Sequence, residues 1–147
     1  MTIAEEQAAA MRFISNFRQH GRGPLRPPEN DDVREATTLA LRTEHFFLNA
    51  TTAQLVVSPT FAGCGWLSEC NGDVLAGRVL YEIKSGDRLF RALDVKQILV
   101  YCALNYASNR CQIDEICLVN PREGVHFSES LNVLCEGMTG QSGVRVS

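Results

Sequence analysis

Asp73, Glu82 and Lys84 are charged residues in a segment that is otherwise mostly apolar or small, NGDVLAGRVLYEIKSG. The pattern of Arg78–Ser85 predicts a strand, in which successive side chains point to opposite faces. Glu82 and Lys84 then share one face with Leu80. Because unpaired charge is costly to bury, a carboxylate and an ammonium on an otherwise apolar strand indicate a functional site.

A tight turn at Ala76-Gly77 would fold Asp73–Ala76 back as a hairpin on the strand that carries Glu82. Asp73 then faces Leu80 and lies diagonal to Glu82 on the same face, at a Cβ separation of about 7 Å or less. Two carboxylates at this separation can both reach one cation. A slip of one residue would move Asp73 to the opposite face, so this geometry depends on the register.

The chemistry that these side chains could perform is metal-assisted hydrolysis of a phosphodiester. Mg²⁺ takes a few carboxylates together with water and phosphate oxygens, and Asp73 and Glu82 fit that role. The backbone carbonyl of Ile83 is a candidate third ligand. Mg²⁺ or Mn²⁺ would lower the pKa of a bound water and neutralise charge on the scissile phosphate. Lys84 could stabilise the pentavalent phosphorane and orient the attacking water.

The block Asp73-x8-Glu82-Ile83-Lys84 resembles the D…(D/E)xK signature of the PD-(D/E)xK nuclease superfamily. It departs from that signature at Gly72, which stands where the name-giving proline would be. The resemblance implies an α/β fold of restriction-endonuclease type, with a three-layer α/β/α core and a mixed central sheet. It also implies a metal-dependent nuclease, with DNA favoured over RNA as the substrate.

The resemblance continues at Gln97 and Tyr101, which look like the QxxxY element of the RecB-like branches. Residues four apart lie on one helical face, where they could contact a phosphate or hold the catalytic lysine in place. The similarity covers about Arg34–Val119. It makes Gln97 a candidate catalytic residue and Tyr101 a candidate nucleic-acid contact, although Tyr101 has apolar neighbours and could be a core residue instead.

Three further residues have two interpretations each. Glu44 could reach a metal through water, as an extra acid on the helix before the sheet, or it could be a solvated helical glutamate. Arg88 and Arg91 flank the predicted site and could bind nucleic-acid phosphates, or they could belong to an exposed helix start.

The elements that must position these residues follow from periodicity, caps and turn signals. Capping boxes at Thr2/Glu5 and Asp32/Glu35 and a cap at Ser128 start three of the predicted helices. The pattern predicts helices over Thr2–His20, Asp32–Asn49, Leu89–Ala107 and Ser128–Met138. It predicts strands over Leu55–Ser58, Gly65–Cys70, Asp73–Ala76, Arg78–Ser85, Gln112–Val119 and Val125–Phe127. Strands joined by tight turns are antiparallel, and a strand after a helical crossover can add in parallel.

The length of 147 residues fits a single domain, with a helix and connector at 1–32, a core at 33–138 and a flexible tail at 139–147. The sequence contains no apolar window of membrane-spanning length, and its first residues lack the basic start of a secretory signal. The six cysteines form no CxxC pair, which favours reduced thiols in the cytoplasm. Four of them repeat one spacing, so a zinc or cluster site at Cys64, Cys70, Cys111 and Cys117 stays open.

The net charge of −3 excludes a basic protein that coats nucleic acid non-specifically. A small acidic nuclease is expected to work as a homodimer or as a subunit of a larger defence or DNA-processing complex. The alternative is a catalytically inactive scaffold or nucleic-acid-binding module on the same fold.

Overall fold

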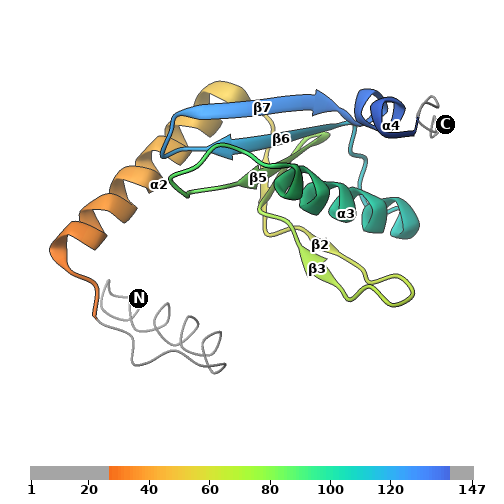
Figure 1. The fold of residues 1–147 in the computed structure, drawn as a ribbon, viewed down its shortest axis with the longest axis horizontal. Helices are drawn as coiled ribbons and strands as arrows, with labels where there is room; N and C mark the ends of the chain where they lie inside the picture. Colours follow the sequence, from red (N-terminus) through yellow and green to blue (C-terminus); the bar gives the residue numbers. More distant parts are fainter. Residues whose placement is uncertain (1–26, 140–147) are drawn as a thin grey trace. The chain divides into compact units, whose positions relative to one another are not determined.

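The structure, a computed structural model, describes residues 27–139 (Figure 1). Contacts divide the chain into two units, Met1–Glu35 and Ala36–Ser147, and helix α2 (Asn30–Ala50) passes from the first to the second. The helix expected at Thr2–His20 lies outside the described residues, and so does the tail expected at 139–147 except for Thr139, which ends helix α4 (Leu131–Thr139). All strands described below belong to the second unit.

A five-stranded mixed sheet forms the centre of the second unit, in the order β1-β4-β5-β6-β7. The β5–β6 pair is parallel and the other three pairs are antiparallel. The predicted α/β class with a mixed sheet is therefore confirmed. The strands are β1 (Leu55–Val57), β4 (Val74–Ala76), β5 (Val79–Ile83), β6 (Glu115–Asn120) and β7 (Val125–Ser130).

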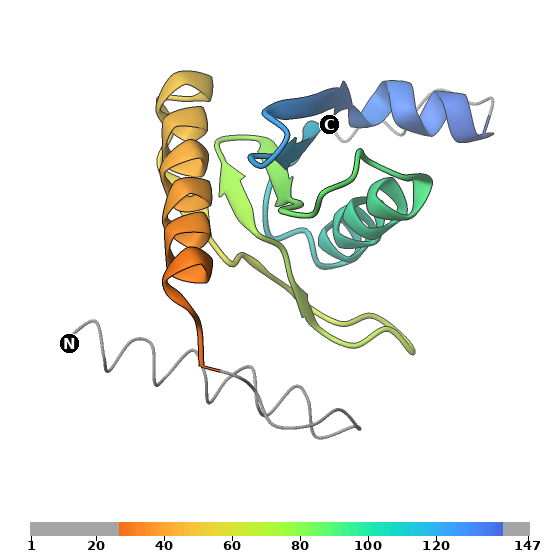
Figure 2. The same cartoon turned by 60° about the vertical axis from the view of Figure 1, so that its left-hand side comes forward.

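The two faces of the sheet are covered by different helices (Figure 2). Helix α3 (Ala92–Ser108) connects β5 to the parallel strand β6 and packs on one face, where a buried cluster includes Leu80, Ile98 and Leu118. The C-terminal part of α2 packs on the other face, where Phe47 and Tyr81 meet with ring centroids 5.0 Å apart. Successive side chains of β5 and β6 point to opposite faces of the sheet, so they pack into two separate cores.

Two short strands form a separate hairpin, which we call the arm: β2 (Thr60–Phe61), β3 (Cys70–Asn71) and the residues between them. The arm extends away from the main sheet (Figures 1 and 2). The predicted strand at Gly65–Cys70 is wrong. Its first half forms the tip of the arm, where Cys64 and Leu67 pair as an isolated bridge.

The register of the β4–β5 hairpin differs from the predicted one. Ala76 pairs with Val79, so the two-residue turn is Gly77-Arg78 and not Ala76-Gly77. The reason is the backbone of Gly77, whose φ of 59° suits glycine at the first central position of a hairpin turn. The register moves by two residues and therefore keeps every side chain on its expected face.

Three helix starts were misplaced. Asp32 lies inside α2 at its third position and is not the N-cap residue; its Oδ2 accepts a hydrogen bond from the backbone N–H of Glu29, the residue before the helix, at 2.8 Å. Helix α3 begins at Ala92 and not at Leu89, because its N-cap is Arg91. The last helix, α4 (Leu131–Thr139), is capped by Ser130, whose Oγ accepts a hydrogen bond from the N–H of Val133 at 3.2 Å.

Candidate active site

Asp73 and Glu82 come together at the end of the β4–β5 hairpin. Continuing the observed register places Asp73 directly across from Glu82 and not diagonal to it, because Val74 already pairs with Tyr81. The Oδ2 atom of Asp73 accepts a hydrogen bond from the backbone N–H of Ile83 at 2.7 Å. Asp73 is thereby tied to the strand that carries Glu82, and the two carboxylates share the face of the sheet covered by α3.

Glu82 is a buried carboxylate with an unused oxygen. Its residue is only 4% exposed, and its Oε2 is a buried atom without a hydrogen-bond partner in residues 27–139. Burial raises the pKa of Glu82, and the neighbouring Asp73 raises it further, while the hydrogen bond from Lys84 acts in the opposite direction. An unsatisfied buried carboxylate oxygen beside a second carboxylate is the kind of ligand that a hard divalent cation takes.

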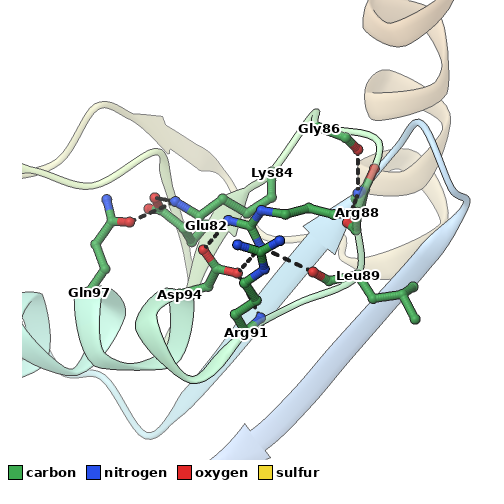
Figure 3. A network of polar contacts seen from close by, with 9 residues as sticks. Glu82, Lys84, Gly86, Arg88, Leu89, Arg91, Asp94 and Gln97 are labelled. Carbon is green, nitrogen blue, oxygen red and sulfur yellow. Dashed lines mark hydrogen bonds and ion pairs between the residues drawn. The ribbon is translucent and has the colours of Figure 1, made fainter.

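Lys84 reaches from the end of β5 towards Glu82 and towards Gln97 of α3 (Figure 3). Its Nζ donates hydrogen bonds to Glu82 Oε1 at 2.8 Å and to Gln97 Oε1 at 2.7 Å. Gln97 Nε2 in turn donates to the hydroxyl of Tyr101 at 2.7 Å. The ammonium is thus bonded to one of the two carboxylates and to the side-chain amide of Gln97.

Gln97 and Tyr101 extend this cluster into α3 at the spacing that the sequence indicated. Tyr101 is half-buried, and its ring stacks on Phe61 with centroids 5.8 Å apart. Its hydroxyl is engaged by Gln97, so in this arrangement it positions the glutamine. The nucleic-acid contact predicted for Tyr101 stays a prediction.

Arg88 and Arg91 flank the site on the segment that leads into α3. Arg88 forms a two-pronged ion pair with the buried Asp94, with Nη1 to Oδ2 at 2.7 Å and Nη2 to Oδ1 at 2.9 Å. These bonds hold the pKa of Asp94 well below its usual range, with a further contribution from the backbone N–H of Arg91. The side chain of Arg91 is exposed at the N-terminus of α3.

Asn120 is a fully buried amide that holds the same segment from the end of β6. Its Nδ2 donates to the carbonyls of Gly86 at 2.9 Å and Arg88 at 3.0 Å, and its Oδ1 accepts from the N–H groups of Arg122 and Glu123. Every polar atom of the amide group is therefore used to join two loops. Asn120 keeps the segment that carries Arg88 next to the site.

Sequence reasoning missed Asp94 and Asn120 as supporting residues. The sequence did contain a signal for Asp94, because an acidic residue three positions after the N-cap is common in the first turn of a helix. For Asn120 the only signal was Asn-Pro directly after a buried strand, a pair that indicates a turn and no more.

Two predicted metal ligands remain without supporting contacts. Glu44 is exposed on α2, the helix that packs on the opposite face of the sheet from Lys84. Ile83 contributes its N–H to Asp73, and the metal role predicted for its carbonyl stays a prediction. Within the described part of the chain, no group of three Asp, Glu, His or Cys side chains converges to hold a metal. The structure therefore brings together a carboxylate pair, without Glu44.

The four-thiolate alternative is wrong, because the sheet separates its members. Cys70 and Cys111 pack against the core under α3, while Cys117 is buried in the core under α2. Cys64 is exposed at the tip of the arm. All six cysteines are free thiols.

A cavity of about 1150 Å³ lies on the α2 side of the sheet, between α2 and strands β5 to β7. Its lining includes Tyr81, Cys117 and Val119, and it contains none of the predicted site residues. The polar cluster around Lys84 is thus on the opposite face from this cavity.

No protein-family model, curated protein or solved structure matches the chain. Among the helices in residues 27–139, none is long and apolar enough to cross a membrane.

Proposed function

We propose that the chain is a metal-dependent nuclease of the PD-(D/E)xK type, with a restriction-endonuclease-like core. The observation that carries the proposal is the pairing of Asp73 with a buried Glu82 whose Oε2 accepts no hydrogen bond in the described residues. Keeping such a carboxylate buried costs stability, which a site for a cation would explain. The position of ExK on a central strand, with α3 directly after it, is consistent with this fold.

In this proposal Asp73 and Glu82 hold Mg²⁺ or Mn²⁺, with the carbonyl of Ile83 as a further ligand. A bound divalent cation supplies Lewis-acid neutralisation of charge on the scissile phosphate. Lys84 places an ammonium beside the same phosphate and stabilises negative charge that develops in the transition state. Gln97 keeps the lysine in place through its 2.7 Å hydrogen bond.

The substrate in this proposal is nucleic acid, and DNA is favoured over RNA because of the motif resemblance alone. Arg91 provides an exposed cation beside the site, where it can contact phosphates, and Arg88 could do so only from a guanidinium already paired with Asp94. A net charge of −3 means that the rest of the chain adds little electrostatic attraction for a polyanion. A second copy of the chain, or a partner in a larger defence or DNA-processing complex, would supply the rest of the binding surface.

The test is cleavage of linear, circular and single-stranded DNA and of RNA, with Mg²⁺ or Mn²⁺. Lys84→Ala removes the proposed catalytic ammonium. Lys96→Ala is the matched control, because Lys96 is an exposed lysine on the same helix as Gln97. We expect the wild type and Lys96→Ala to cut and Lys84→Ala to be inactive. A wild type that cuts nothing and binds no Mn²⁺ would identify an inactive scaffold and refute the proposal.

A further inference from the structure

Trp66 is the one tryptophan of the chain and lies at the tip of the arm, where it is 98% exposed. An indole ring left entirely in water forgoes the stabilisation that burial would give it, which is about the largest of any side chain. At this exposure both faces of the ring are open to a ligand. A side chain of this kind is suited to stacking against a flat partner.

The turn that carries Trp66 has a defined backbone. Cys64 and Leu67 exchange two backbone hydrogen bonds of 3.0 and 3.1 Å, with Gly65 and Trp66 as the central residues. Gly65 has a φ of 61°, which is the arrangement of a type II′ hairpin turn. A Cβ on Gly63 would lie 2.6 Å from the carbonyl oxygen of Leu67, so only glycine fits at this position beside the turn.

The two strands of the arm, β2 and β3, connect directly to residues of the candidate active site. Phe61 of β2 is fully buried and stacks on Tyr101, the residue that receives the hydrogen bond of Gln97. The other strand of the arm runs through Gly72, whose N–H donates to the carbonyl of Pro59 at 3.0 Å, directly into Asp73. The arm and the carboxylate pair are therefore joined at one base.

The reach of the arm matches the scale of a nucleic-acid substrate. Trp66 precedes Asp73 by seven residues (73 − 66), so an extended chain places its backbone within roughly 23 Å of Asp73. That length corresponds to about seven nucleotides along one strand of B-form DNA. A strand bound at Lys84 can therefore extend to the tip of the arm.

We propose that Trp66 is a stacking platform for an unpaired base of the nucleic acid bound at the site. This inference rests on the proposed nuclease function and names the form of substrate that it takes, one with unpaired nucleotides near the cleavage point. Stacking on an aromatic ring is tolerant of sequence, since every base has a flat face. Between Thr60 and Asn71 the only ionisable side chains are those of Glu69 and the two cysteines, so this contact acts through the ring and not through phosphates.

A protein partner is the less favoured occupant of the tip. Leu67, 47% exposed, is the only other large apolar side chain that the arm exposes, and such a surface falls far short of the area that a specific protein interface buries. A single exposed ring is better matched to one base than to a protein surface.

The single tryptophan allows a direct test by fluorescence on the full chain. The probes are oligothymidylate, oligouridylate and a fully paired duplex of the same length, with EDTA present so that nothing is cut. We expect oligothymidylate or oligouridylate to quench Trp66 emission more strongly than the duplex does. In parallel, anisotropy of the labelled oligonucleotide should show about tenfold weaker binding by Trp66→Ala. Trp66→Phe should restore most of the binding, and Leu67→Ala is the control that leaves it unchanged.

The possible outcomes separate this inference from the nuclease proposal. Quenching together with weaker binding by Trp66→Ala supports the platform, even if the wild type cuts no substrate and the nuclease proposal fails. An oligonucleotide that is bound or cut without any change in Trp66 emission overturns the platform and leaves the nuclease proposal standing. Absence of binding overturns the platform, while the nuclease proposal is decided separately by the cleavage and Mn²⁺-binding tests. Emission that changes with protein concentration alone identifies contact between two copies of the chain and also overturns the platform.

Discussion

The Nζ of Lys84 lies 2.7 Å from Oε1 of Gln97, and this hydrogen bond joins the end of β5 to α3. The same ammonium lies 2.8 Å from Oε1 of Glu82. A lysine side chain is long and flexible, and two such contacts restrict it before any substrate binds. The ammonium is thus pre-organised next to the carboxylate pair, which is the condition for electrostatic stabilisation of a transition state.

Lys84→Ala should lower the cleavage rate by at least about 100-fold, the scale on which a single preorganised charge stabiliser contributes. Mn²⁺ binding should remain, because Asp73 and Glu82 are unchanged. The measurement is single-turnover cleavage beside a calorimetric Mn²⁺ titration, with Lys96→Ala as the control. Equal rates for Lys84→Ala and wild type would contradict the role of the lysine.

Gln97→Ala should reduce kcat about tenfold or more with little change in KM, since it releases Lys84 without touching substrate. Tyr101→Phe removes the hydroxyl that Gln97 contacts and keeps the ring on Phe61. It should have a smaller effect in the same direction. In the double variant the two losses should be less than additive, because both act on the same lysine. Fully additive losses would show that the residues act separately.

Glu82→Gln should stabilise the metal-free chain, because it removes a buried charge whose second oxygen lacks a partner among the described residues. The wild type, but not this variant, should gain stability with Mn²⁺, by about 2.7 kcal/mol at a hundredfold excess over Kd. Thermal unfolding with and without Mn²⁺ measures both effects. Glu136→Gln, at an exposed position of α4, is the control. A Glu82→Gln variant that gains as much from Mn²⁺ as the wild type would argue against a metal at this site.

Asp94→Asn should cost about 1 kcal/mol or more at neutral pH, because it weakens the charge-assisted hydrogen bonds that Asp94 accepts from Arg88 and from the backbone N–H of Arg91. The pKa of Asp94 is lower in the folded chain than its ordinary value, so its contribution is present above the unfolded pKa of about 3.9. That contribution is lost as the pH falls from there through the lower pKa of the folded state. Urea unfolding should therefore show the gap between wild type and variant closing below about pH 4. A gap that stays constant there would contradict this origin of the stability.

Asn120→Ala should destabilise the chain by about 2 kcal/mol or more, because it leaves the carbonyls of Gly86 and Arg88 without their partner. The segment between β5 and α3 should then open more often. Amide hydrogen exchange of residues 85–91 measures this opening, while exchange in β4 should be little affected. Unchanged exchange in that segment would show that other contacts hold it.

The two-residue periodicity of VLYEI sufficed to predict β5 and the common face of Glu82 and Lys84. The i,i+4 spacing likewise placed Gln97 and Tyr101 together on α3. These features follow from local geometry, which a sequence displays directly. The position of Asp73 was less well predicted, since the turn was set by the positive φ of Gly77 and not by the hydrophobic pattern.

The arm and the buried supports of the site depend on contacts between distant parts of the chain. Thr60 pairs with Asn71, and nothing in the segment Gly65–Cys70 shows that it turns back at Gly65-Trp66 instead of forming a strand. Asn120 reaches Gly86 across 34 positions of sequence. A single sequence carries no local signal for such pairings, because the same polar residue would be satisfied equally well by water.

The parallel pairing of β5 with β6 also has a consequence for the order of folding. The β4–β5 hairpin is local in sequence and can close within microseconds, which brings Asp73 and Glu82 together early. The backbone N–H of Lys84, however, is bonded to the carbonyl of Val119, a partner that becomes available only after α3 has crossed over and β6 has docked. Long-range parallel pairing is slow to form. During synthesis from the N-terminus, the carboxylate pair therefore assembles before the lysine is anchored, and the backbone of Lys84 is held beside Glu82 only once β6 has paired with β5.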